Sequence, residues 1–246
     1  MSEELKRSVR SGKCYLYLLI GSIAAMYLAR GIGSKLSLPV LMTLVIYPVY
    51  ALDLSQGRRN LAVCHTLFWA FVSSVLMIYF VRQDAAHMAK RVFRGVSYRD
   101  NMFQWILTGE GSEGNIRLFL PEHIKHFAIF CVSSFVTAGV WGLAFGAVLL
   151  NYMNFYVGSL SLKAHPPFLV FLFGWPLWSY LRVIGFVLCG ITLSEPLLSQ
   201  LIRFRPDFRR SSRYFIFGLV LILADIFLKA ALAPFWRGLL RRIVSL

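Results

Sequence analysis

Long runs of apolar residues, separated by short polar stretches, dominate the pattern along this chain. A helix needs about 20 mostly apolar residues to cross about 30 Å of hydrocarbon. Because lipid offers no hydrogen-bond partners, the backbone groups of each run must pair within the run, which predicts helices. Six runs of 16 to 31 residues meet this description: Cys14–Ala29, Leu36–Leu52, Leu61–Val81, Phe127–Val157, Phe168–Leu193 and Tyr214–Phe235.

The composition supports the same interpretation. The chain of 246 residues is 58% hydrophobic and 15% charged, and its mean hydropathy is +0.64. A soluble domain carries about a quarter charged residues, so ordinary soluble and disordered classes are excluded. We therefore predict an all-α fold: one membrane domain over residues 1–246, with five or six transmembrane or membrane-embedded helices. We expect a multi-pass protein of the plasma (inner) membrane.

The excess of basic residues suits a membrane surface better than a nucleic acid. There are 26 Lys and Arg residues against 11 Asp and Glu, a formal net charge of +15. They flank the apolar runs, where each contributes about 1 kcal/mol of attraction to anionic lipid headgroups. The aromatic residues lie inside the runs and are not interleaved with basic clusters, so nucleic-acid binding is not predicted. The expected partners are a bilayer with anionic lipids and either further copies of this chain in a homo-oligomer or another subunit of a membrane complex.

The first run raises a question of topology, because its 16 residues span only about 24 Å. If all six runs cross and the N-terminus is inside, ten basic residues lie inside and fourteen outside, against the positive-inside rule. If the first run does not cross, eighteen lie inside and six outside. We favour this second topology, with the hydrophilic region 82–126 in the cytoplasm; six crossings with the N-terminus outside are the alternative.

The hydrophilic region begins with a helical pattern and ends in a glycine-rich stretch. Its apolar residues fall on one stripe, which predicts a basic amphipathic helix lying on the membrane surface. The stripe consists of Val81, Ala85, Met88 and Val92. Residues 108–115 contain a G-x-G-x-x-G spacing but no preceding strand, and their acids would repel a pyrophosphate. This stretch is predicted to be a flexible loop.

Charged residues inside the apolar runs are the strongest candidates for a site, because ionisable groups are costly at that depth. Asp225 and Lys229 lie four residues apart in the sixth run, and Arg182 has no acid near it in the fifth. We predict that Arg182 pairs with Asp225 within the membrane, while Lys229 extends toward the interface. Asp53 and Glu195 lie at run ends, where we expect water to reach them.

Other polar residues within the runs have two interpretations each. The amides of Asn151 and Asn154 either line a substrate path or hydrogen-bond between packed helices. Pro176 precedes Arg182 and is predicted to kink or break the fifth helix. A ladder of small residues in the fourth run predicts a close helix–helix contact, within the protein or in an oligomer. The ladder comprises Ser134, Ala138, Gly142 and Gly146.

Histidines offer two weaker hypotheses of ligand binding. Glu122, His123 and His126 lie within about one helical turn and carry metal-ligand groups. His65 and His165 lie in different segments at one expected depth, so they are candidate haem ligands. Ordinary interfacial or hydrogen-bonded histidines explain both patterns as well, and no cofactor is predicted.

Three classes of function follow from these residues. No catalytic motif is present, so we favour a transporter-like protein or a non-catalytic subunit of a membrane complex over an enzyme. The alternative is an intramembrane enzyme acting on a lipid or lipid-linked anion, in which Arg182 holds a phosphate and the group around His123 transfers protons. A haem- or quinone-binding redox subunit is the third possibility.

Overall fold

A computed structural model describes residues 3–244, with side chains from residue 12 onward. The fold is an all-α bundle, as predicted, and the described residues form no β-strand. The helices in chain order are α1 (Glu3–Gly31), α2 (Ser37–Ser55), α3 (Arg59–Gln83), α4 (Ala85–Arg91), α5 (Gly95–Thr108), α6 (Ile116–Val136), α7 (Val140–Ser161), α8 (Phe168–Phe173), α9 (Leu177–Ile202) and α10 (Phe208–Ile243). A short 3₁₀ turn, η1 (Ser112–Gly114), precedes α6.

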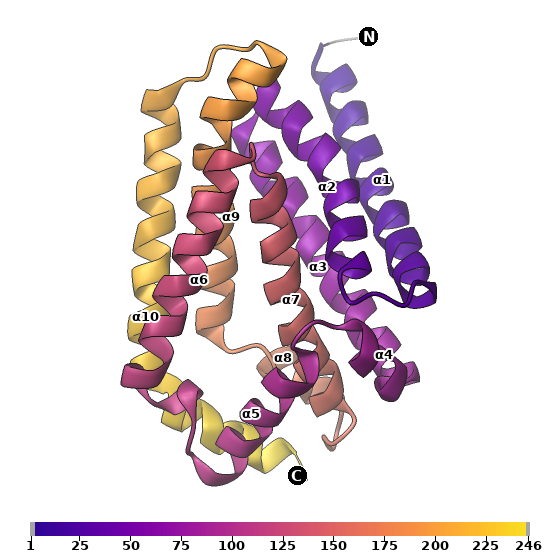
Figure 1. Cartoon of the computed structure of the whole chain (residues 1–246), viewed down its shortest axis with the longest axis vertical. Helices are drawn as coiled ribbons and strands as arrows, with labels where there is room; N and C mark the ends of the chain where they lie inside the picture. Colours follow the sequence, from indigo (N-terminus) through magenta and orange to yellow (C-terminus); the bar gives the residue numbers. More distant parts are fainter. Residues whose placement is uncertain (1–2, 245–246) are drawn as a thin grey trace.

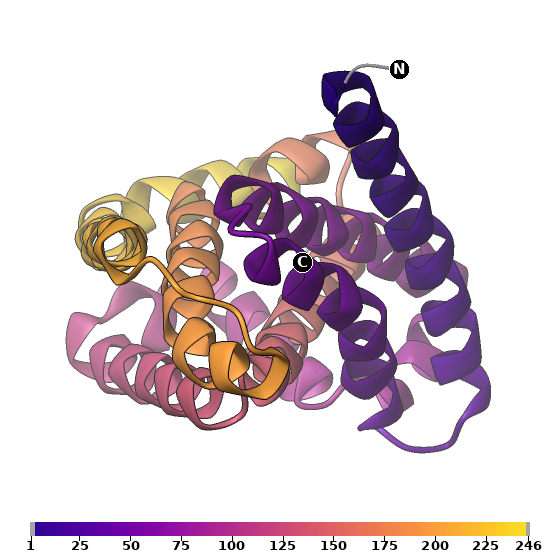
Figure 2. The same cartoon turned by 90° about the horizontal axis from the view of Figure 1, so that it is seen from above.

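Six of these helices are long and apolar enough to cross a membrane, which makes the chain an integral multi-pass membrane protein. They are α1, α2, α3, α7, α9 and α10. The 21-residue α6 runs along the bundle beside α7 and α9 (Figure 1), and its first half includes Arg117, Glu122 and Lys125. Seen from above, α1 and α10 lie at opposite sides of the bundle (Figure 2). Between them, α7 packs against α2, α3, α6 and α9.

The fourth apolar run folds as a hairpin, so the prediction of one helix over Phe127–Val157 is wrong. Chain direction reverses at Ala138 and Gly139, whose φ angles of +51° and +91° end α6 and begin α7. The side chain of Thr137 accepts a hydrogen bond from the Trp141 amide and so caps the new helix. A single 31-residue helix would also be about 46 Å long, well beyond the hydrocarbon thickness.

The small-residue ladder is therefore divided between the two arms of this hairpin. Ser134 lies on α6 and Gly142 on α7, and a Cβ on Gly142 would come within 2.0 Å of Ser134 Oγ. The predicted close contact exists, but it joins antiparallel neighbours and is not one face of one helix. Ala138 is in the turn, and Gly146 continues along α7.

The fifth apolar run is broken where Pro176 predicts. Pro176 has an extended backbone (φ −61°, ψ 147°) and separates α8 from α9. Arg182 consequently lies in the second turn of α9, nearer one end of the bundle than the run length indicates. In α2 the helix continues through Pro48.

The region between α3 and α6 closes the lower end of the bundle in Figure 1. The apolar stripe of α4 packs inward: Met88 and Val92 are 2% and 1% exposed. The predicted surface helix is thus wrong, because the stripe contacts the bundle and not the lipid. Below α5, the guanidinium of Arg237 donates hydrogen bonds to the carbonyls of Trp105, Ile106 and Leu107, which caps the end of that helix.

The observed path also changes the charge count. α1 packs along α2 and α3 with Leu18 and Met26 in the core and is long and apolar enough to cross, which favours the alternative in which the first run crosses. The α6–α7 hairpin then returns the chain to the lower end. By chain position, thirteen of the 26 Lys and Arg residues belong to lower-end segments and eleven to upper-end segments. The predicted imbalance of eighteen to six is wrong; the cytoplasmic location of 82–126 stays a prediction.

Candidate functional site

A cavity of about 330 Å³ lies among α3, α6, α7, α9 and α10. Its lining extends for about three to four helical turns, from Met153 of α7 to Gly139, which directly precedes α7, and from Ser179 to Gly190 on α9. Most of the lining is apolar, including Phe127 and Phe186. This volume falls at the small end of the usual range for small-molecule sites, about 300–1,000 Å³.

Charged residues gather at the lower end of the cavity. Arg182 of α9 binds Asp225 of α10 through two parallel hydrogen bonds, Nε–Oδ2 and Nη2–Oδ1, each 2.9 Å long. The predicted contact between these residues is thus confirmed. Asp225 is fully buried, whereas 25% of the Arg182 side chain is exposed. The second outer nitrogen of the guanidinium, Nη1, has no hydrogen-bond partner among the described residues, and Arg182 is one of the residues that line the cavity.

A second ion pair lies one turn further along α10. Lys229 Nζ donates to Glu113 Oε2 at 2.8 Å, and Trp178 Nε1 donates to the other oxygen of Glu113 at 3.3 Å. The prediction that Lys229 extends to the interface is wrong, since its side chain is 3% exposed.

Glu113 was hidden from sequence reasoning because it belongs to the glycine-rich loop that was predicted to be flexible. Burial, the largest single influence, raises the pKa of Glu113, but the Lys229 ammonium, the Arg182 guanidinium and the hydrogen bond from Trp178 together lower that pKa below its usual value. Glu113 therefore stays ionised at neutral pH. One signal in the sequence could have indicated such a partner: once Asp225 is assigned to Arg182, no acid remains near Lys229 in its own apolar run, so a carboxylate from another segment is expected.

Several polar atoms beside this cluster have no partner among the described residues. Tyr98 (α5) and Tyr152 (α7) line the cavity with their ring centroids 4.6 Å apart, and neither hydroxyl has a hydrogen-bond partner in the described part of the chain. Burial raises the pKa of Tyr98 well above 10, so its phenol stays protonated. His123 also lines the cavity, and its Nε2 is buried without a hydrogen bond. Sequence reasoning missed both tyrosines because neither stands out among the 11 tyrosines of the chain.

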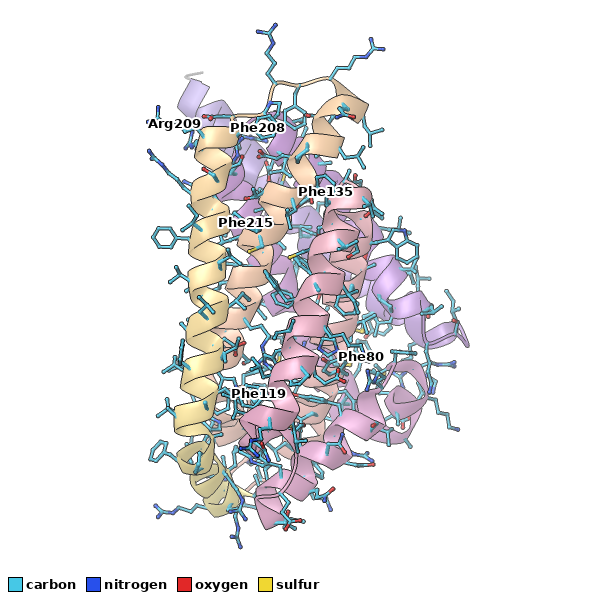
Figure 3. All side chains as sticks on the ribbon, turned by 60° about the vertical axis from the view of Figure 1, so that its left-hand side comes forward. Phe80, Phe119, Phe135, Phe208, Arg209 and Phe215 are labelled. Carbon is cyan, nitrogen blue, oxygen red and sulfur yellow. The ribbon has the colours of Figure 1, made fainter. Side chains whose placement is uncertain are left out.

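The cavity reaches the lipid-facing surface between α6 and α10. These helices both pack on α9, and their backbones stay apart although His123 of α6 comes within 3.5 Å of Asp225 of α10. Ile124 of α6 and Leu223 of α10 line the cavity and are also 58% and 55% exposed. Figure 3 shows this side, with α9 between the other two helices and Phe119 at the lower end of α6. We call this opening, between Ile124 and Leu223, the portal.

The predicted metal and haem groupings do not form. His123 faces Asp225, whereas Glu122 lies beside His126 at 3.7 Å, and no three potential ligands gather anywhere in the described chain. His65 is at the start of α3, about 25 Å along the helix from Arg82. Because Arg82 bonds to Ser161, just before His165, the two histidines lie at opposite ends of the bundle and cannot share one haem.

The two asparagines pack between helices and do not line the cavity. Asn154 donates to Ser74 Oγ at 2.8 Å and accepts from Trp175 Nε1 at 2.9 Å. Asn151 donates to Met42 Sδ at 3.3 Å. Of their two interpretations, the contacts favour helix packing.

A separate buried cluster closes the upper end of the bundle. Arg59 binds both Glu195 and Ser211, and Asp53 binds His65 and Arg58. Asp53 and Glu195 are fully buried, so the expectation that water reaches them is wrong. None of these residues lines the cavity.

No protein-family model matches this sequence, and the searches of curated proteins and of solved structures give no significant match.

Proposed function

We propose that this integral membrane protein takes an amphiphilic molecule from the bilayer through the portal into its cavity, as a transporter-like protein for lipids or lipid-derived molecules does. The observation that carries this proposal is one cavity that joins an apolar wall, a polar end and an opening toward lipid. An alkyl chain fits the apolar part, and a polar headgroup fits the end near Arg182. Ligand sites of this kind are mostly apolar with a few polar groups that fix orientation.

The enzyme hypothesis receives support from one contact, the 3.5 Å approach of His123 Nε2 to Asp225. Its proposed phosphate-binding residue is less well supported, because Asp225 already takes two nitrogens of the Arg182 guanidinium. The haem hypothesis has lost its pair of ligands. A carrier or binding role therefore explains the cavity with fewer requirements than catalysis.

The test is native mass spectrometry of the purified protein, compared with a variant whose cavity is filled. A Cβ on Gly146 would make only an ordinary 3.8 Å contact, with Phe130. The substitution Gly146→Leu therefore fills part of the cavity with a larger side chain at little strain. We expect the unmodified protein to retain one amphiphile per chain and the variant to retain at least ten-fold less.

The matched control is Ala24→Leu, which enlarges an exposed residue on α1 away from the cavity. It should retain the amphiphile like the unmodified protein. Equal retention by the unmodified protein and Gly146→Leu, with both correctly folded by thermal unfolding, would contradict the proposal.

A further inference from the structure

The groups at the polar end of the cavity also indicate which headgroup it receives. Resting on the function proposed above, we infer that the ligand carries an uncharged headgroup with hydroxyl or carbonyl oxygens, as a monoacylglycerol does, and not an anionic one.

The first argument is charge balance. The lower cluster contains two cations and two anions, and each is paired: Arg182 with Asp225, and Lys229 with Glu113. A bound phosphate or carboxylate would leave a net negative charge in a water-poor site, where an uncompensated ion is costly. An uncharged headgroup leaves the balance unchanged.

The second argument is the mixture of hydrogen-bonding groups. His123 Nδ1 lies 3.0 Å from the carbonyl oxygen of Phe119, and a carbonyl only accepts, so Nδ1 carries the proton. At 3.5 Å, Nε2 is too far from Asp225 for a charge-assisted hydrogen bond of about 2.7–2.9 Å. The ring is therefore neutral, and Nε2 offers a lone pair.

The free donors complete the site. Tyr98 and Tyr152 each offer a hydroxyl, and Arg182 offers Nη1. A hydroxyl on the ligand has an acceptor in His123, and carbonyl or hydroxyl oxygens have donors in the tyrosines and the arginine. The phosphate group of a monoester near neutral pH mainly accepts hydrogen bonds, so it has few O–H groups to donate to the histidine lone pair.

The experiment compares 1-dodecanoylglycerol with its phosphate monoester, which has the same chain and glycerol. Binding to the protein in nanodiscs, where no detergent competes, is measured by displacement of radiolabelled 1-dodecanoylglycerol. We expect the uncharged molecule to bind at least ten-fold more tightly. Tyr152→Phe should weaken its binding about five-fold, whereas Tyr79→Phe, on an exposed tyrosine outside the cavity, should leave it unchanged.

The outcomes separate this inference from the function on which it rests. Equal or tighter binding of the phosphate, abolished by Gly146→Leu, overturns the uncharged headgroup but supports the amphiphile cavity. Saturable binding of neither molecule, together with no amphiphile retained in native mass spectra, overturns both.

Discussion

The upper and lower ends of this bundle each contain an ion pair between an arginine and a carboxylate, but the surroundings of the two pairs differ. At the upper end, Arg59 is 4% exposed and meets Glu195, Ser211 and the carbonyl of Asp207. At the lower end, Arg182 is 25% exposed, hydrogen-bonds within the described residues only to Asp225, and lines the cavity. Under the proposed function, the lower arginine marks the binding site because its surroundings leave a donor unused, whereas the donors of the upper arginine are taken up by the fold.

The upper cluster also fastens helices that are distant in sequence. Arg59 begins α3, Glu195 belongs to α9, and Ser211 belongs to the first turn of α10. Removing one partner of a fully buried pair leaves an uncompensated charge, which is among the largest single losses of stability in proteins. We therefore assign this end to stability and the lower end to binding.

The largest effect on stability is expected from Glu195→Ala, which leaves the buried Arg59 guanidinium without its carboxylate partner. The free energy of unfolding should fall by about 3–5 kcal/mol, as measured by denaturant unfolding in lipid–detergent micelles. The double variant Arg59→Met with Glu195→Leu should recover most of this loss, because it removes both charges. A single-variant loss below about 1 kcal/mol would show that the upper cluster does not secure the fold.

A smaller effect is expected at the lower end. Arg182→Met and Asp225→Leu should each lower the unfolding free energy by about 2–4 kcal/mol, since the exposed part of Arg182 softens the penalty. The double variant should regain part of the stability, which a double-mutant cycle measures as coupling. Even so, this double variant should bind 1-dodecanoylglycerol at least five-fold more weakly than the unmodified protein. The upper-end double variant should bind it as the unmodified protein does. Strictly additive losses would refute the pairing.

The smallest effect concerns pH and the pair between Glu113 and Lys229. The pKa of Glu113 is lowered by Lys229, so the pair stabilises the fold fully above the usual carboxyl pKa of about 4.5. The stabilisation is lost as pH falls through the lowered value. Glu113→Gln should therefore cost about 1–3 kcal/mol at pH 7 and progressively less below pH 4.5.

The control for this measurement is Glu122→Gln. Glu122 is 51% exposed and lies 3.8 Å from Lys125, so its removal should cost no more than about 1 kcal/mol. If the two variants lose equal stability at pH 7, Glu113 is not a buried partner of Lys229.

Several parts of the fold were predictable because they depend on composition and local geometry. Long apolar runs require helices in lipid, and an extended proline such as Pro176 ends one. The pairing of Arg182 with Asp225 was predictable as well, because few acids lie within apolar runs and an isolated guanidinium at that depth is costly.

The remainder depends on contacts between distant segments. The reversal at Ala138 and Gly139 occurs inside an unbroken apolar run, where hydropathy contains no signal of a turn. That one reversal changed the helix count and divided the small-residue ladder, and together with the path of α1 it removed the charge asymmetry between the ends. Glu113 was missed for a related reason: a polar loop reads as solvent-exposed unless the helix that buries it is known.

The bidentate pair also constrains how the chain enters the membrane during synthesis. Arg182 is made forty-three residues before its partner, so α9 alone presents an unneutralised guanidinium to the insertion machinery. The five-residue connection from Arg203 to Asp207, and the close approach of Gly185 and Gly218, let α9 and α10 associate as soon as both have emerged. We expect these two helices to leave the translocon together as one hairpin, and a nascent chain truncated before Asp225 to hold α9 poorly in the bilayer.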